Sequence, residues 1–262
     1  MNYLVIENRT AGFFSNFNLI IGSLSSLHDS EIRNFYFLWN NPLYQVNKEN
    51  LFDKYFYKQN IEAIATKSPD SNKFRFDKVY TTVELAVHLF SFVTPIEVFK
   101  KMNSVLRIYN YFDNEIYKHC NIISAKRPNT LGVHVRGTDH SQHGKLLTLD
   151  YYFSKIDEKL NSNYDNLFLA TDETKIVKAF VDRYGSTVFT NSEIKRSDTM
   201  QGIHFSNFAS KEKLAIDVMT DAASLANCEE LIFTASNVAG YVLMLNPDIK
   251  HEQIDKHIEF IP

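Results

Sequence analysis

Residues 131–139 read LGVHVRGTD, and this stretch decides the fold assignment. Its apolar first half predicts a buried strand, and charged side chains follow directly. Side chains alternate across a strand, so His134 and Arg136 share one face. A basic side chain beside a glycine, at the carboxyl end of a strand, is typical of the ligand edge of an open α/β sheet. Arg136 therefore suits a phosphate group, to which guanidinium donates two parallel hydrogen bonds. The alternative is a surface pair with Asp139.

Strands and helices alternate through the second half of the chain. Short apolar runs predict strands and longer amphipathic runs predict helices. Such alternation is typical of parallel βαβ units, and it predicts an α/β fold with a doubly wound parallel sheet. The expected strands are 131–135, 166–170, 186–190 and 230–234, and the expected helices are 149–160, 173–184, 211–226 and 238–245.

The first half carries the same two periodicities less regularly. Residues 3–7, 34–39 and 74–82 are expected to be strands, and residues 13–27 and 84–92 helices. The sequence Thr94-Pro95-Ile96-Glu97 is a helix start with a capping box, and it predicts one helix running to about Cys120. Lys126-Arg127-Pro128-Asn129 then breaks the chain. We therefore expect an N-terminal α/β domain over residues 1–127 and a C-terminal Rossmann-like domain over residues 128–262.

Composition narrows the function classes. The chain has 262 residues, of which 44% are hydrophobic, so a globular fold is expected. Its net charge of −3 argues against a nucleic-acid partner. Only two cysteines occur, which favours a reducing, cytoplasmic location. No signal peptide or membrane-spanning stretch is evident, and peripheral membrane association is left open.

Polar side chains follow three of the expected parallel strands. These clusters are His134 with Arg136, then Thr171-Asp172-Glu173, then Thr234 to Asn237. Because the carboxyl ends of parallel strands meet at one edge, the three clusters are expected to line one crevice. Ser236 and Asn237 are suitable N-cap residues, and a helix N-terminus attracts phosphate.

Three acidic residues allow a structural or a functional interpretation. Asp221 lies within the helix 211–226, where its carboxylate is either solvated or accepts hydrogen bonds from the N1 and 2-amino edge of guanine. Asp172 and Glu173 are either site residues or stabilise the first turn of a helix through its dipole. The histidines do not have the spacing of a metal site, and no Asp-x-Asp pair occurs. No metal or cofactor is therefore expected, and hydrolase, NTPase and redox motifs are absent from the sequence.

The order VHVRGTD, FLATDE, DAASLANCEELIFTASN resembles the α1,6-fucosyltransferases and their O-fucosyltransferase relatives, including the rhizobial nodulation fucosyltransferase. The likeness is best over residues 131–245, and AGFFSN near the N-terminus is similar to the first loop of that family. The resemblance implies a GT-B-like architecture, with two Rossmann-like α/β domains facing a cleft. It also implies a metal-independent, inverting transfer of fucose from GDP-fucose to a glycan acceptor, with the first domain on the acceptor side.

The resemblance also implies roles for individual residues. Arg136 matches the arginine that stabilises the departing diphosphate, and His134 and Asp221 match residues that hold the guanosine. Ser236 or Asn237 matches the phosphate-binding helix start. The remaining donor-site positions implied by the family are Gly12, Ser15 and Asn16 in the first loop and Asp172 in the acidic pair with Glu173.

The sequence departs from the family pattern at two positions. Gly137 stands where the family often has a second arginine, for which Lys145 or Arg196 is a possible substitute. The glutamate base of the core N-glycan enzyme falls near Gly144, so His143 is the candidate catalytic base, or else a loop histidine. These departures keep two alternatives open: a non-catalytic nucleotide-sugar or glycan-binding protein, and a transferase for another nucleotide sugar. Trp39 is either an acceptor-stacking ring or a core residue.

Overall fold

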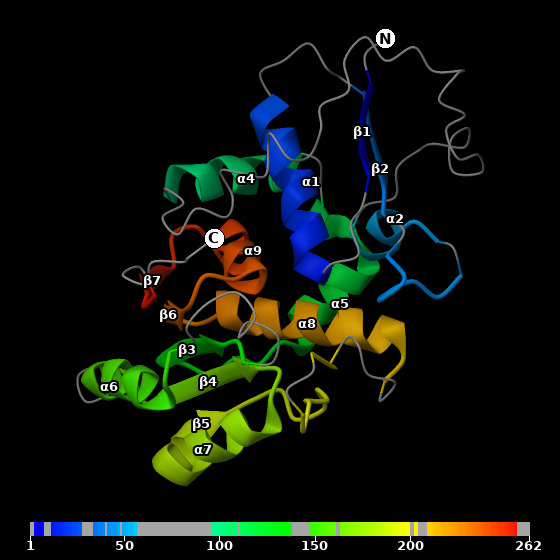
Figure 1. The fold of residues 1–262 in the computed structure, drawn as a ribbon. Coiled ribbons are helices and arrows are strands. Elements are labelled where there is room, and N and C mark those ends of the chain that lie inside the picture. Colours follow the sequence, from blue (N-terminus) through cyan, green and yellow to red (C-terminus); the bar gives the residue numbers. More distant parts are fainter. Residues whose placement is uncertain are drawn as a thin grey trace. The chain divides into compact units, whose positions relative to one another are not determined.

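A computed structural model shows how the chain folds (Figure 1). The structure describes residues 3–7, 12–27, 34–39, 41–47, 49–56, 96–108, 111–137, 147–160, 163–199, 202–203 and 209–255. The chain divides into two compact units, Met1–His119 and Cys120–Pro262. The expected strand 74–82, the helix 84–92 and the capping box at Thr94 lie outside the described residues, and the predicted domain boundary at 127/128 stays a prediction.

The first unit combines a parallel strand pair with helices. Strands β1 (Tyr3–Glu7) and β2 (Asn34–Leu38) pair in parallel, as their alternation with α1 (Phe13–Leu27) predicts. The short helix α2 (Leu51–Tyr55) begins at Asn50, whose Oδ1 accepts hydrogen bonds from the backbone N–H groups of Phe52 and Trp39, each at 3.2 Å. Aromatic rings from these elements form a buried cluster: Phe13, Phe17, Trp39, Tyr55 and Phe56.

The single helix predicted from residue 94 to about 120 is wrong. The structure has α4 (Ile96–Ile108), a 3-10 turn (Tyr111–Asp113) and a second helix α5 (Glu115–Ile123). Asn114 explains the break, because its Oδ1 accepts the backbone N–H of Ile116 at 2.8 Å and so starts a new helix. Asparagine side chains compete with the backbone for hydrogen bonds in this way. The apolar periodicity continues across the break, which is why it predicts one helix.

The second unit is built on a five-stranded parallel sheet in the order β5-β4-β3-β6-β7. The central strand β3 is buried along its whole length, as expected for a strand covered on both faces. Strands and helices alternate along this unit, as the sequence predicts for all of them except β7: β3 (Thr130–Val135), α6 (Leu149–Leu160), β4 (Asn166–Thr171), α7 (Thr174–Tyr184), β5 (Val188–Phe189), α8 (Lys211–Ala226), β6 (Glu230–Phe233), α9 (Asn237–Leu245) and β7 (Lys250–Gln253).

Helices cover both faces of this sheet. On one face, α6 and α7 contribute Phe153, Ile156 and Phe180 to a core that includes Val133 and Leu169 from the strands. Helix α8 contacts β3 and β4, and it packs against α9 (Figure 1). At the start of β3, Gly132 lies so near Cys228 that an added Cβ would be 3.0 Å from its Sγ.

Two strands differ from the expectation. The strand predicted over residues 186–190 is reduced to Val188–Phe189, because residues 185–187 form a 3-10 turn. Strand β7 was not predicted at all. Its sequence, Lys-His-Glu-Gln, is polar and its side chains are exposed or half-buried, which is typical of an edge strand that packs one side against water.

Candidate functional site

The predicted clusters meet at the carboxyl edge of the five-stranded sheet. Strand β3 lies between β4 and β6, and all three run in parallel. His134 in β3 pairs in register with Ala170 in β4 and Phe233 in β6. The residues that follow the three strands are therefore neighbours, as the sequence predicts. This edge, formed by residues 134–137, 171–173 and 234–237, is called the strand-end edge below.

His134 and Ser236 connect β3 with the start of α9. The side chain of His134 is buried, and its Nδ1 lies 3.3 Å from Ser236 Oγ. Ser236 is the N-cap of α9, and its Oγ accepts the backbone N–H of Ala239 at 3.1 Å. The predicted capping role of Ser236 is confirmed. The contact fixes the imidazole beside the positive end of a helix, where an anion is favoured.

Arg136 and Gly137 extend β3 past its last hydrogen-bonded pair. The side chain of Arg136 is half-buried. The backbone N–H of Gly137 donates to Asp172 Oδ1 at 3.3 Å, so the polar residue after β4 orients the chain after β3. Asp172 is half-buried.

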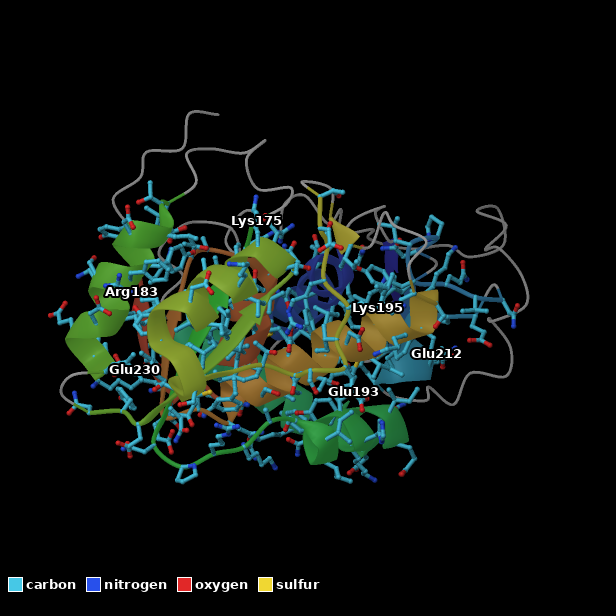
Figure 2. The ribbon with its side chains drawn as sticks, turned by 90° about the horizontal axis from the view of Figure 1, so that it is seen from below. Lys175, Arg183, Glu193, Lys195, Glu212 and Glu230 are labelled. Carbon is cyan, nitrogen blue, oxygen red and sulfur yellow. The ribbon has the colours of Figure 1, made fainter. Side chains whose placement is uncertain are left out.

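Glu173 directly precedes α7, and its carboxyl group lies against Gly137. A Cβ added to Gly137 would be 1.9 Å from Glu173 Oε1 and 3.0 Å from Ile176 Cδ1. Glu173 is the N-cap residue of α7, but its side chain makes no capping hydrogen bond, and the carboxyl group is buried. Glu173 therefore does not cap α7 through a side-chain hydrogen bond. Its two interpretations, as a site residue or as an acidic group favoured by the helix dipole, stay predictions. Its Oε2 lies 2.7 Å from Lys175 Nζ, an ion pair at the start of α7 (Lys175 is labelled in Figure 2).

The end of β7 adds a residue that the sequence did not predict. Asp255 is buried, and its Oδ2 accepts the backbone N–H of Ala235 at 2.8 Å. Its Oδ1 accepts the side-chain amide of Gln253 at 2.9 Å. A carboxylate thus fixes the turn between β6 and α9. Recognition of β7 as a strand would have located Asp255 at the same edge.

Tyr152, on helix α6, contacts the turn after β6. Its hydroxyl donates to Thr234 Oγ1 at 3.2 Å. Burial raises the pKa of Tyr152 well above its ordinary value, although the hydrogen bond with Thr234 lowers it, and nearby Asp255 adds a lesser rise. The phenol therefore stays protonated and acts as a hydrogen-bond donor to Thr234.

Asp221 lies on α8, and its side chain is 8% exposed. Its Oδ1 accepts the side-chain amide of Asn191 at 2.7 Å. Burial raises the pKa of Asp221 to about 7, against the opposing effects of Arg196 and Asn191. The solvated alternative for Asp221 is wrong. Arg196 is engaged in this region, donating to the carbonyl of Ile194 at 3.0 Å, rather than substituting for a second arginine beside Gly137.

The predicted first-loop residues lie at the start of α1 in the first unit. The carbonyl of Gly12 accepts the N–H of Ser15 at 3.0 Å, which closes the first turn. A Cβ on Gly12 would meet nothing within 4 Å. Ser15 is half-buried and Asn16 is buried. Trp39 is fully buried against Phe13, so the acceptor-stacking alternative is wrong and the core alternative is confirmed.

Some predicted positions lie outside the described residues. These are the candidate base His143, together with Asp139 and Lys145. Within the described part of the chain, no group of three or more His, Cys, Asp or Glu side chains is arranged to hold a metal ion. None of the helices in that part is long and apolar enough to cross a membrane.

The fold matches solved fucosyltransferase structures. The structure of NodZ alpha-1,6-fucosyltransferase soaked with GDP-fucose superposes with a TM-score of 0.59 at 16% identity, covering 99% of this chain and 98% of that one. Fucosyltransferase NodZ from Bradyrhizobium gives a TM-score of 0.55 at 15% identity, with the same coverage of both chains. The sequence matches no protein-family model and no curated protein. The predicted α/β class is confirmed, and the arrangement of two domains around a cleft remains a prediction.

Proposed function

We propose that the protein is a glycosyltransferase that transfers fucose from GDP-fucose to a glycan hydroxyl by a metal-independent, inverting displacement. The observation that carries the proposal is the strand-end edge itself. It brings a half-buried arginine, a buried histidine and the capped N-terminus of α9 together on a fold shared with fucosyltransferases. This combination suits a nucleoside diphosphate, because its charge is distributed over several oxygens.

The chemistry required of the site is stabilisation of a leaving group. As the bond from fucose to the diphosphate breaks, negative charge develops on the diphosphate, and the sugar acquires oxocarbenium character. Arg136 and the amides at the start of α9 are proposed to stabilise that charge. One preorganised donor of this kind lowers the barrier by roughly 3 kcal/mol. The acceptor hydroxyl attacks the opposite face of the sugar, and His143 is proposed to take its proton.

His134 and Asp172 are proposed to shape the donor site. The contact between His134 and Ser236 keeps the imidazole beside the helix start, where it can face the nucleotide. Asp172 holds the backbone after Arg136 through the N–H of Gly137. Asp221 is proposed to accept the N1 and 2-amino hydrogens of guanine. Gly12, Ser15, Asn16 and Asn237 complete the proposed donor-contact set.

The test is release of GDP from GDP-fucose, measured with and without glycan acceptors. Arg136→Ala is expected to lower the turnover rate by about a hundredfold to a thousandfold. Arg183→Ala is the matched control, since Arg183 pairs with Asp157 on the neighbouring helix and is partly exposed. Equal turnover by the Arg136→Ala and wild-type proteins would refute the role of Arg136. Equal affinity of Asp221→Ala and wild-type protein for GDP would refute the guanine assignment.

A second candidate function is a non-catalytic nucleotide-sugar or glycan-binding protein on the same fold. The position of Glu173 favours it, because a buried carboxyl group lies against Gly137, where a further cation would assist departure of the diphosphate. Binding of GDP-fucose without GDP release on any acceptor would support this candidate. A thermal shift assay with GDP, UDP and ADP distinguishes a GDP-fucose transferase from a transferase for another nucleotide sugar, because the nucleotide of the true donor is expected to stabilise the protein most.

A further inference from the structure

One face of α8 carries ionisable side chains at four-residue spacing. Lys213, Asp217 and Asp221 follow one another at the spacing that brings helix side chains together. Lys213 Nζ lies 2.6 Å from Asp217 Oδ1, whereas Asp217 Oδ2 is buried without a hydrogen-bond partner. Figure 2 shows Lys195 on the segment beside α8, and the backbone of Lys195 contacts Asp217. Two carboxyl groups are therefore buried close together on one helix.

Asn191 fixes the orientation of Asp221. The side-chain amide of Asn191 donates to Asp221 Oδ1 at 2.7 Å and to Ser224 Oγ at 3.1 Å. Ser224 in turn donates to the carbonyl of Thr220 at 2.8 Å and accepts the backbone N–H of Ala125 at 2.9 Å. Both amide hydrogens of Asn191 and the hydroxyl hydrogen of Ser224 are thereby used. The hydrogen bond from Asn191 thus orients the carboxyl group of Asp221, and the hydrogen bond to Ser224 fixes Asn191 in turn.

Arg196 fixes the segment that carries Asn191. Its guanidinium donates to the carbonyls of Asn191, at 3.4 Å, and of Ile194, at 3.0 Å. Its Nε is buried and has no hydrogen-bond partner. The same segment is joined to the end of β4, because the N–H of Ser197 donates to the carbonyl of Asp172 at 2.7 Å. Arg196 thus brings a positive charge toward α8. The loop that carries it is held by the contact of Asn191 with Asp221 and by the contact of Ser197 with Asp172.

The charges around Asp221 oppose one another. Burial raises its pKa, Arg196 and then Asn191 lower it, and Asp217 raises it. Two strands that α8 contacts, β3 and β4, contribute further ionisable residues near this layer, His134 within β3 and Asp172 just after β4. Lys213 faces Asp217 on the same helix. The side chains that shift the pKa of Asp221 are thus Arg196, Asn191 and Asp217, none of which has a proposed contact to a nucleotide.

We propose that Asn191 and Arg196 are positioning residues that keep Asp221 oriented and ionised for a guanine base, and that Asp217 acts against them. The proposal rests on the guanine role given to Asp221 under the proposed function. Guanine presents two donors, N1–H and the 2-amino group, and only an ionised carboxylate accepts both with its two oxygens. Arg196 and Asn191 favour this form, and their effect on nucleotide binding is indirect.

The consequence is nucleotide affinity that depends on pH near neutrality. The apparent dissociation constant rises as the binding-competent fraction falls. Because the pKa of Asp221 is about 7, GDP is expected to bind roughly thirtyfold more weakly at pH 5.5 than at pH 8. The phosphate of GDP also titrates in this range, but its titration is common to all variants and cancels when their midpoints are compared.

The experiment compares three variants in which the expected shifts have different signs. GDP affinity is measured by calorimetry from pH 5.5 to 8.5 for wild-type, Asn191→Leu, Arg196→Met and Asp217→Asn proteins. The midpoint is expected to move to higher pH in Asn191→Leu and Arg196→Met, which lose a stabilising donor or charge. It is expected to move to lower pH in Asp217→Asn, which loses a like charge. Structural damage alone would weaken binding at every pH without moving the midpoint, and that result would overturn the proposal.

A second measurement separates this proposal from the proposed function. The carboxyl titration of Asp221 is followed by carbon-13 NMR in the same four proteins without nucleotide. Shifts of opposite sign, with Asp217→Asn below wild type and the other two above it, support the positioning roles whether or not GDP binds. Titrations that coincide in all four proteins overturn them. Failure of wild-type protein to bind GDP at any pH, with the opposed shifts present, overturns the proposed function instead.

Discussion

The contact between Gly137 and Glu173 predicts the effect of adding one methyl group. In Gly137→Ala, the new Cβ would lie 1.9 Å from Glu173 Oε1, 2.5 Å from its Cδ and 3.0 Å from Ile176 Cδ1. Glu173 is 2% exposed, so the carboxyl group must leave a buried position or the backbone just after β3 must shift. Overpacking of this kind costs about 1–3 kcal/mol in free energy of unfolding. Gly12→Ala is the matched control, because its Cβ meets nothing within 4 Å.

Two further variants test the cause of that cost. Glu173→Ala removes the atoms that would clash, and Glu173→Gln keeps their shape. The double variant Gly137→Ala with Glu173→Ala is expected to recover stability relative to the sum of the single effects, by about 1–2 kcal/mol. The double variant with Glu173→Gln is expected to recover none. A destabilisation that is additive with Glu173→Ala would show that the two residues do not clash.

The assay must report on the second unit of the chain. Trp39 is the single tryptophan and is buried in the unit Met1–His119, so its fluorescence reports on that unit. Amide hydrogen exchange in β3 measures the opening free energy beside Gly137. Exchange in β3 is expected to accelerate in Gly137→Ala while the urea midpoint followed by Trp39 fluorescence stays unchanged. Unchanged exchange in β3 would refute the reasoning.

Three other predictions concern residues around the sheet. Glu230 is buried, and its carboxylate lies 2.7 Å from Lys159 Nζ and 2.9 Å from Lys250 Nζ. Burial raises the pKa of Glu230, but the two lysines and Tyr164 outweigh burial and lower that pKa overall. The stabilisation from ionised Glu230 is therefore present above the unfolded-state pKa and is lost as the pH falls through the folded-state pKa. In urea unfolding, Glu230→Gln is expected to lower the free energy of unfolding by about 1–3 kcal/mol at pH 7 and by little at pH 3. An equal loss of stability at both pH values would contradict this. Ser236→Ala and Ser210→Ala each remove an N-cap and are expected to lose about 1 kcal/mol, but only Ser236→Ala is expected to weaken GDP binding in calorimetry; equal affinities would count against the helix-start site. Cys120 and Cys228 are buried, and burial raises the pKa of both thiols, to about 12 for Cys228. Labelling of these cysteines by a thiol reagent at pH 8 is therefore expected to be slow until urea is added. Rapid labelling of the folded protein would refute their burial.

The sequence predicts the second unit well because its strands are apolar and its helices amphipathic. The parallel sheet follows from that alternation, and the strand-end edge follows from the sheet, so His134, Asp172 and Ser236 are neighbours as expected. Strand β7 escapes prediction because Lys250–Gln253 has no apolar face. The break between α4 and α5 escapes because Asn114 overrides a continuing apolar stripe.

Contacts between distant side chains are the part that the sequence does not specify. Glu173 is an acidic residue at a helix start, and nothing in the local sequence indicates that its side chain lies against Gly137, where the missing Cβ leaves room for it. Asp221 is separated from Asn191 by a polar segment, and nothing in the local pattern indicates that their side chains meet. Asp255 follows a strand that was not predicted, so its contact with Ala235 could not be anticipated. Tertiary packing decides all three.

The central claim is that the strand-end edge holds a guanosine diphosphate group, and a crystal soaked with GDP-fucose tests it most directly. The diphosphate is predicted to lie between Arg136 and the start of α9 at Ser236, with the guanine edge at Asp221. Diphosphate density away from Arg136 and Ser236, or a guanine base that does not contact Asp221, would contradict the claim.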